Sequence, residues 1–253
     1  MNRESELYRE QLKALGITKG DVLLVHSSMK ALKTKRTPEE VIRDIQEVLT
    51  PEGTLMIPTL TYDNVNSESP VFDVIHTEPC MGLVPTRFLK MDGVVRSMHP
   101  TSSIAVWGAN AKEFAQAHIL DETPVGSHSP IMQLPRLQGK ILFIGKLLHK
   151  CTFMHGVEEV VGAPYCLNKE TTHYILKDEN GETIERDLYA HNFYGWGAEY
   201  QRIKKILAYP DIKEGKLGEA DCFIIDAKCL FEKAKEKFKE APYYFVTDIS
   251  AYI

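Results

Sequence analysis

Short apolar runs that end in polar or turn residues recur along the first part of the chain and predict buried β-strands. They cover residues 21–26, 54–58, 103–107 and 140–145. After the first run, Thr37-Pro38-Glu39-Glu40 combines a capping box with proline at the first helical position, and apolar residues recur on one helical face through about Leu49. A strand, a helix and a second strand in this order form a βαβ unit, which predicts that the two strands are parallel.

The patterns after residue 58 predict shorter helices and, towards the C-terminus, a hairpin. Helical patterns cover residues 84–89, 111–117, 130–137 and 227–239, the last of them stopped by Pro242, whereas residues 60–82 are polar and loop-like. Alternating runs at 171–177 and 182–189 flank Asn180-Gly181, a dipeptide typical of a tight hairpin turn.

Neither an internal repeat nor a linker rich in Pro, Gly or Ser interrupts the chain, so we expect a single α/β domain. Its architecture is predicted to be a sandwich. A mixed, partly parallel central sheet is flanked by helices, and a C-terminal subregion contains the hairpin.

The overall composition excludes several classes of protein. Of the 253 residues, 43% are hydrophobic and 26% are charged, values typical of a globular protein and not of a disordered or collagen-like chain. The 30 Lys and Arg residues against 35 Asp and Glu give a formal net charge of −5 without a basic block, which argues against nucleic-acid binding. The five cysteines form no CxxC pair, which argues against a zinc ribbon or a thioredoxin-like site.

The N-terminal segment and the cysteine usage predict a cytoplasmic protein. Residues 1–6 are charged and lack the apolar core of a signal peptide, and no apolar run approaches the roughly 18 residues of a membrane span. Widely spaced free thiols in a chain of this length are typical of the cytosol. We therefore expect no membrane among the partners.

Four short segments place polar groups where a predicted strand ends or a helix follows it, which is where α/β proteins bind ligands. They are residues 26–29, 96–103, 126–130 and 152–159. The hydroxyls of Ser27 and Ser28 suit a phosphate or an amide oxygen, and Arg96 with the hydroxyls after it suits an anionic ligand such as a nucleotide phosphate. Structural alternatives are a helix cap for the first segment, a polar surface loop for the second, and an N-cap at Ser129 for the third.

The fourth segment carries a candidate general base. In a helix, His155 and Glu158 stand three residues apart on one face, near enough for the carboxylate to orient the imidazole. An imidazole held by a carboxylate is the minimum arrangement for general-base catalysis on an amine or a hydroxyl. Taken alone, a structural histidine is the alternative.

Six short motifs occur in a fixed order over residues 20–160. They are V-H-S-S from Val25, G-T-L-M-I-P-T from Gly53, Met81-Gly82, R-S-M-H-P from Arg96, G-S-H-S-P from Gly126 and T-F-M-H-G-V-E from Thr152. In this order they resemble the aminoglycoside 3-N-acetyltransferase family, whose members use acetyl-CoA to acetylate antibiotics. The resemblance implies an α/β sandwich that differs from the common small acetyltransferase fold.

The resemblance also implies roles for particular residues. His155 is expected to be the catalytic base and Glu158 the acid that orients it. The side chains expected to receive the pantetheine and phosphates of CoA are Ser27, Ser28, Arg96, Ser97, His99, Thr101 and Ser103. A single acetyltransferase domain is expected over residues 1–253, with the CoA-binding and catalytic core at 20–160 and an acceptor-side region at 165–253.

The expected function is acetyl transfer from acetyl-CoA to an amine of an aminoglycoside or a related amino sugar, by direct attack and without a metal. CoA and a small-molecule amine are the expected partners, and a homodimer is the expected assembly. Three alternatives stay open: acyl transfer to a non-antibiotic amine, a ping-pong route through Cys151, and a CoA-binding protein without catalysis. A fourth is metal-dependent hydrolysis with zinc held by His149, Cys151, His155 and Glu158.

Overall fold

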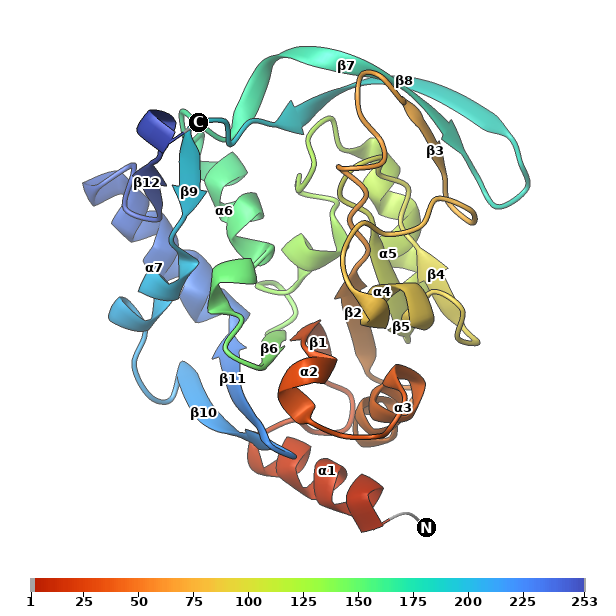
Figure 1. Ribbon diagram of the computed structural model, residues 1–253, viewed down its shortest axis with the longest axis vertical. Helices are drawn as coiled ribbons and strands as arrows, with labels where there is room; N and C mark the ends of the chain where they lie inside the picture. The colour runs from red at the N-terminus through yellow and green to blue at the C-terminus, as the bar shows by residue number, and fades with distance from the viewer. Residues whose placement is uncertain (1–2, 253) are drawn as a thin grey trace.

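A mixed sheet of seven strands organises the computed structural model, which describes residues 3–252 (Figure 1). In spatial order the strands are β10 (Ile212–Leu217), β11 (Ala220–Asp226), β6 (Lys140–Ile144), β1 (Val22–Ser27), β2 (Thr54–Pro58), β5 (Ile104–Gly108) and β4 (Val94–Arg96). The three central strands β6, β1 and β2 are parallel, and the outer strands are antiparallel to their neighbours. The predicted mixed, partly parallel sheet is confirmed.

The predicted βαβ unit forms as expected. Helix α3 (Pro38–Leu49) connects β1 to β2, and Leu23 of the first strand pairs in register with Leu55 of the second. The helix begins with the predicted capping box, in which the side chain of Thr37 accepts from the Glu40 N–H and the Glu40 carboxylate accepts from the Thr37 N–H.

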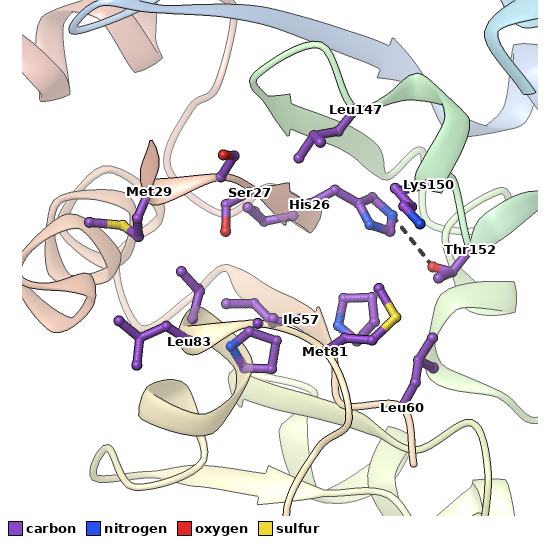
Figure 2. Close-up of a pocket in the computed structure, with 16 residues that line it drawn as sticks. His26, Ser27, Met29, Ile57, Leu60, Met81, Leu83, Leu147, Lys150 and Thr152 are labelled. Atoms are coloured by element: carbon purple, nitrogen blue, oxygen red, sulfur yellow. Dashed lines mark hydrogen bonds between the residues drawn. The ribbon is translucent and has the colours of Figure 1, made fainter. Parts of the chain in front are cut away.

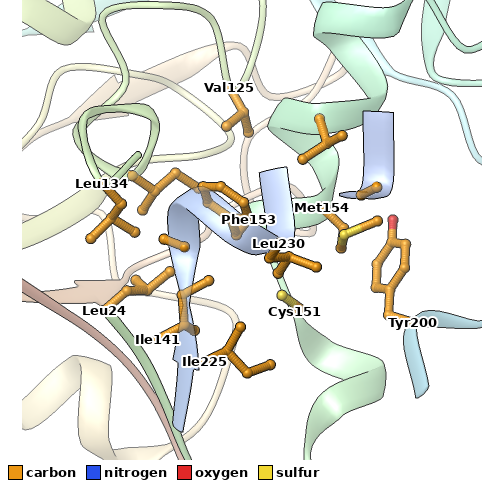
Figure 3. Packing of buried hydrophobic residues seen from close by; sticks show 14 of the residues in the cluster. Leu24, Val125, Leu134, Ile141, Cys151, Phe153, Met154, Tyr200, Ile225 and Leu230 are labelled. Atoms are coloured by element: carbon orange, nitrogen blue, oxygen red, sulfur yellow. The ribbon is translucent and has the colours of Figure 1, made fainter. Parts of the chain in front are cut away.

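Helices cover both faces of the sheet (Figure 1). One face packs against α1 (Arg3–Ala14), α3 and α4 (Leu83–Phe88), and the other against α5 (Ala111–Ala117), α6 (Phe153–Val161) and α7 (Ala227–Glu240). Each face has its own hydrophobic core, the first under α1, α3 and α4 and the second under α5, α6 and α7. Along β1, Leu23 and Val25 pack into the first core and Val22 and Leu24 into the second, because successive strand residues point to opposite faces. Figure 3 shows Leu24 in the second core, beneath Phe153 of α6.

A long hairpin stands apart from the central sheet and crosses the top of the view in Figure 1. It consists of β7 (Leu167–Lys177) and β8 (Thr183–His191), which extend the two predicted runs at their outer ends. The segment 60–82, expected to be a loop, contributes the short strand β3 (Val71–Asp73), which pairs with β7. A small core that includes Phe72, Tyr174 and Leu188 lies under these strands.

The remaining elements are short. They are α2 (Met29–Leu32), β9 (Trp196–Ala198), β12 (Val246–Asp248) and the 3₁₀ helices η1 (His118–Leu120), η2 (Pro130–Gln133), η3 (Leu148–Lys150), η4 (Tyr200–Lys205) and η5 (Ser250–Tyr252). The helix expected over 130–137 is thus a single 3₁₀ element. Within residues 3–252, no helix combines the length and the apolar character that crossing a membrane requires.

Loss of the capping box is expected to weaken α3 measurably. In Thr37→Ala the Glu40 N–H loses its acceptor, which should lower the free energy of unfolding by about 1 kcal/mol. Urea unfolding followed by circular dichroism measures this loss. Thr37→Ser keeps the hydroxyl and should stay close to the parent protein, and equal losses in both variants would show that the cap does not contribute.

Candidate active site

Two adjoining cavities open where the parallel strands end. The first, here called the β1 cavity, has a volume of about 410 Å³ and is lined by residues 25–29 together with residues from 57–60, 81–85 and 147–152. The second, the hairpin cavity, has a volume of about 570 Å³ and lies beneath residues 168–174 and 190–193 of the hairpin region. The two cavities share four lining residues, Leu60, Met81, Lys150 and Thr152. A ligand in one can therefore meet a ligand in the other.

The V-H-S-S segment forms one wall of the β1 cavity (Figure 2). Ser27 and Ser28 both line it, as their predicted role requires, and Ser28 also caps the short helix α2 by accepting from the Ala31 N–H. The wall on the other side is apolar and includes Ile57, Met81 and Leu83 (Figure 2).

His26 connects the end of this wall to the second cavity. Its ring stacks on Phe143, and its Nε2 lies 3.4 Å from Oγ1 of Thr152 (Figure 2). Burial, with a smaller contribution from the nearby His155, lowers the pKa of His26 to about 3. The imidazole is therefore uncharged near neutral pH.

Arg96 lies in the interior and not on a cavity wall. Its Nε donates to Oγ of Ser103 at 2.9 Å, and its two terminal nitrogens donate to the carbonyl oxygens of Thr59 and Thr77 at 3.0 and 2.5 Å. All three guanidinium nitrogens thus already have protein acceptors, and burial lowers the pKa of Arg96 to about 10, which leaves it charged at neutral pH. This geometry departs from the predicted contact with CoA phosphates, because the motif alone does not reveal which way the side chain points.

Ser97 and Ser103 are also fully buried and line neither cavity. The Ile104 N–H donates to Oγ of Ser97 at 2.8 Å, and this hydroxyl lies 2.8 Å from Nδ1 of His118, whose Nε2 lies 3.2 Å from the carbonyl of Pro124. The chain of contacts is complete when Ser97 donates to Nδ1 and Nε2 carries the proton. Ser97 and Ser103 therefore belong to the interior network and not to a ligand-facing wall.

His99 and Thr101 lie on either side of the boundary between interior and cavity. The His99 ring is buried, its Nδ1 accepts from the backbone N–H of Ser102 at 3.1 Å, and burial lowers its pKa well below the usual value. Its Nε2 has no partner in the described chain. Thr101, predicted to contact CoA, and Ser102 line the hairpin cavity and not the β1 cavity.

The predicted His155–Glu158 pair forms, and two tyrosines complete it. Glu158 is fully buried, and its Oε2 lies 3.1 Å from Nδ1 of His155 and accepts from the Tyr200 hydroxyl at 2.8 Å. Its Oε1 accepts from the Tyr165 hydroxyl at 3.1 Å. Burial raises the pKa of both tyrosines, so each hydroxyl stays protonated and able to donate. A proton on Nδ1 directed at the carboxylate leaves Nε2 of His155 with a free lone pair.

The ring of His155 is part of the wall of the hairpin cavity, with 23% of its side chain exposed. Because Thr152 lies one helical turn away and borders both cavities, the His155 imidazole lies close to the place where they meet. The arrangement can accept a proton from a group bound in the hairpin cavity.

A second histidine–carboxylate pair, which the sequence patterns do not predict, lies beside the first. Nε2 of His191, on β8, lies 2.7 Å from Oε1 of Glu159, and its ring centroid is 4.9 Å from that of His155. Burial lowers the pKa of His191. The adjacent acids Glu158 and Glu159 are visible in the sequence, but the approach of His191 depends on the hairpin folding back over α6, which no local pattern signals.

The alternatives based on Cys151 and on zinc find little support in the geometry. Cys151 is fully buried, lines neither cavity, and its pKa is raised by burial to about 12, so it is a protonated thiol (Figure 3). Nowhere in residues 3–252 do three or more His, Cys, Asp or Glu side chains gather as a metal site would require. His149 therefore does not join His155 and Glu158 in a ligand set.

The fold and the site define an α/β protein in which a carboxylate-held histidine lines one of two adjoining cavities. A profile of the family described as aminoglycoside 3-N-acetyltransferase matches residues 24–239. The chain belongs to this family.

Individual relatives agree with that assignment. Aminoglycoside N(3)-acetyltransferase VII of Streptomyces paromomycinus is 31% identical over 171 residues, which cover 60% of this chain and 59% of the relative. Aminoglycoside N(3)-acetyltransferase III of a Salmonella species is 27% identical over 248 residues, which cover 87% of this chain and 85% of the relative.

Solved structures share the whole fold. A histidine-to-alanine mutant of aminoglycoside acetyltransferase AAC(3)-IVa, in complex with a gentamicin, superposes with a TM-score of 0.82 at 25% identity, covering 98% of this chain and 93% of that one. A binary complex of AAC-IIIb with CoASH superposes with a TM-score of 0.80 at 21% identity, covering 93% and 96%, and shows the likeness in fold alone.

Replacement of Arg96 is expected to affect stability and not cosubstrate binding. Arg96→Lys keeps the charge but cannot donate to Ser103, Thr59 and Thr77 together, so the free energy of unfolding should fall by roughly 2–3 kcal/mol. The KM for acetyl-CoA should not change. A raised KM in a variant of unchanged stability would instead restore the predicted contact with CoA.

Acidification is expected to destabilise the protein below pH 6.5. Burial lowers the pKa of His118 from 6.5 to about 4, so between these values the unfolded chain binds a proton that the folded protein does not. The contribution of His118 to the free energy of unfolding is therefore fully present above pH 6.5 and falls as the pH drops through this window. The lowered pKa values of His26 and His99 act in the same direction. Urea unfolding at a series of pH values measures the slope.

His118→Gln, which removes one of these groups, should reduce the slope even though its overall stability is lower. His173, exposed on the hairpin, has a pKa raised by Asp187, which gives the opposite sign, so His173→Gln should not reduce the slope. An unchanged slope in His118→Gln would contradict this account.

Proposed function

We propose that the protein is an acetyl-CoA-dependent N-acetyltransferase that transfers the acetyl group to an amine of an aminoglycoside or a related amino sugar. Attack is direct, and His155 is the general base. The observation that carries the proposal is the His155 ring, held at Nδ1 by the buried Glu158 and partly exposed in the cavity that adjoins the β1 cavity.

The β1 cavity suits the pantetheine arm of acetyl-CoA. It has hydroxyls of Ser27 and Ser28 on one side for the amides of the arm and an apolar wall on the other, and Lys150 provides a cation at its junction with the hairpin cavity. In this assignment Arg96, Ser97, His99 and Ser103 support the wall from the interior, and Thr101 faces the acceptor.

The division of labour along the chain follows from these cavities. The β1 cavity is lined entirely from residues 25–152, which lie within the proposed CoA-binding core, residues 20–160. Of the acceptor-side region predicted over residues 165–253, residues between 168 and 200 line the hairpin cavity, and residues from 60–67 and 101–104 line it as well. A homodimer stays a prediction, which analytical ultracentrifugation would check.

The chemistry assigned to the side chains is proton transfer and orientation. Acetyl-CoA supplies an activated thioester whose thiolate is a good leaving group. As the acceptor nitrogen forms its bond to the acetyl carbon, Nε2 of His155 takes the proton that the nitrogen loses, and the departing CoA sulfur can take it in turn. Glu158 stabilises the positive charge that forms on the ring, as the carboxylate of a Ser-His-Asp triad does.

Tyr165 and Tyr200 keep this carboxylate in place. Each donates to one of its two oxygens, and both are neutral, so they satisfy Glu158 without cancelling its charge. A carboxylate with fixed orientation keeps the proton of His155 on Nδ1 and the lone pair of Nε2 in the cavity.

Removal of the imidazole is expected to abolish most of the activity and leave CoA binding intact. His155→Ala should lower kcat by about 10²–10⁴-fold, the usual contribution of a positioned general base. A thiol-release assay measures kcat, and calorimetry measures CoA affinity.

His173→Ala is the matched control, because that imidazole also pairs with carboxylates but lies exposed on the hairpin and lines neither cavity. Full turnover by His155→Ala would remove His155 from the mechanism. If calorimetry detects no CoA binding to the parent protein, the proposed function itself is wrong.

A further inference from the structure

The wall of the hairpin cavity contains no carboxylate. None of the residues that line it is Asp or Glu, although all of them lie in the described part of the chain. Its ionisable nitrogen groups come from Lys150, His149, His155 and His191. The remaining polar lining consists of amides and hydroxyls.

Carboxylates that neighbour this wall by contact or in sequence do not line it. Glu158 is fully buried behind His155, and Oε1 of Glu159 accepts from His191 and from the backbone N–H of Val125 at 2.8 Å. Oε2 of Glu159 has no protein partner, but the atom is buried and Glu159 does not line the cavity. Asp63, Glu68 and Glu170, sequence neighbours of lining residues, are exposed and do not line it either.

This distribution of charge is unfavourable for an acceptor with several ammonium groups. Each group that enters loses hydration, and the wall itself offers no carboxylate to replace the lost water. Lys150 adds repulsion between like charges. A polycationic aminoglycoside therefore meets an electrostatic penalty for every amine beyond the one that reacts.

The same wall suits a neutral polyhydroxylated ring with one amine. Asn66, Asn168 and Thr172 offer donors and acceptors for hydroxyls, and Tyr62 and Phe193 offer aromatic faces. The single amine needs only to reach Nε2 of His155.

On the basis of the proposed acetyl transfer, we infer that the acceptor of this protein is an amino sugar whose only ammonium group is the one acetylated, and not a polycationic aminoglycoside. The inference narrows the substrate class of the same site. The observation that carries it is the composition of the cavity wall.

The test compares glucosamine with gentamicin at saturating acetyl-CoA, with thiol release as the readout. We expect kcat/KM for glucosamine to exceed that for gentamicin at least about tenfold, equivalent to about 1.4 kcal/mol.

The outcomes separate the two proposals. A kcat/KM for gentamicin equal to or above that for glucosamine overturns the inference and leaves the acetyltransferase proposal standing. If calorimetry shows that CoA binds but neither amine is acetylated, the inferred acceptor and the proposed amino-sugar activity both fail. If CoA does not bind, the proposed function fails first.

A carboxylate introduced into the wall tests the cause directly. Asn168→Asp changes one lining amide to an acid of the same shape and should raise the gentamicin-to-glucosamine ratio of kcat/KM about tenfold. Gln116→Glu, on an exposed position of α5 away from both cavities, makes the same change in net charge and should leave the ratio unaltered.

Asn66→Asp, in the 60–67 segment of the wall, is the second variant should Asn168→Asp not fold. A ratio that does not move in a folded wall variant, or that moves equally in Gln116→Glu, overturns the inference.

Discussion

The buried carboxylate of Glu158 is the constraint on which the site depends. An ionised carboxyl group without partners in the interior would cost several kcal/mol, so the fold tolerates it only with donors in place. Here three side chains, His155, Tyr165 and Tyr200, converge on its two oxygens. They come from α6, from the turn after it and from η4, so a single charge ties together three separate segments of the chain.

The sheet determines where the Glu158–His155 pair lies relative to the two cavities. Because β6, β1 and β2 run in parallel, the chain leaves all three strands at one edge, and the antiparallel β5 enters at that edge. Ser27 at the end of β1 and Ser102 before β5 thus line neighbouring cavities although they are far apart in sequence. Helix α6 follows β6 and brings His155 to the same edge, while the hairpin closes the second cavity from outside.

Sequence patterns could predict the features that depend on contacts between residues close together in the chain. The capping box at Thr37, the hairpin and the i, i+3 pair of His155 and Glu158 all rest on contacts within a few residues, and each forms, although the Asn180-Gly181 dipeptide lies in a longer loop and not in a two-residue turn. The six motifs likewise predicted the family, because their order along the chain can be read from the sequence without knowledge of the fold.

The direction in which a side chain points, and contacts between residues far apart in the sequence, could not be predicted in the same way. Arg96 and Ser27 look equally suited to a ligand in the sequence, yet the first points into the interior and the second into a cavity. The difference arises because the Arg96 guanidinium bonds backbone carbonyls in the 59–77 region, a contact that only the folded chain creates. His191 reaches α6 through strand pairing, and its position is a property of the hairpin as a whole.

The neutral imidazoles around His155 complete the electrostatic argument. In the proposed mechanism His155 becomes a cation when it takes the proton of the acceptor amine, and any charged neighbour of the same sign would oppose that step. Burial lowers the pKa of both His26 and His191, so these two rings, on either side of the site, stay uncharged near neutral pH. The positive charge that forms in the reaction then lies against the fixed negative charge of Glu158, and of the charged side chains in the cavity wall only Lys150 opposes it. The fold therefore keeps the two neighbouring imidazoles neutral beside the proposed base, so that neither opposes the charge that the proposed reaction places on His155.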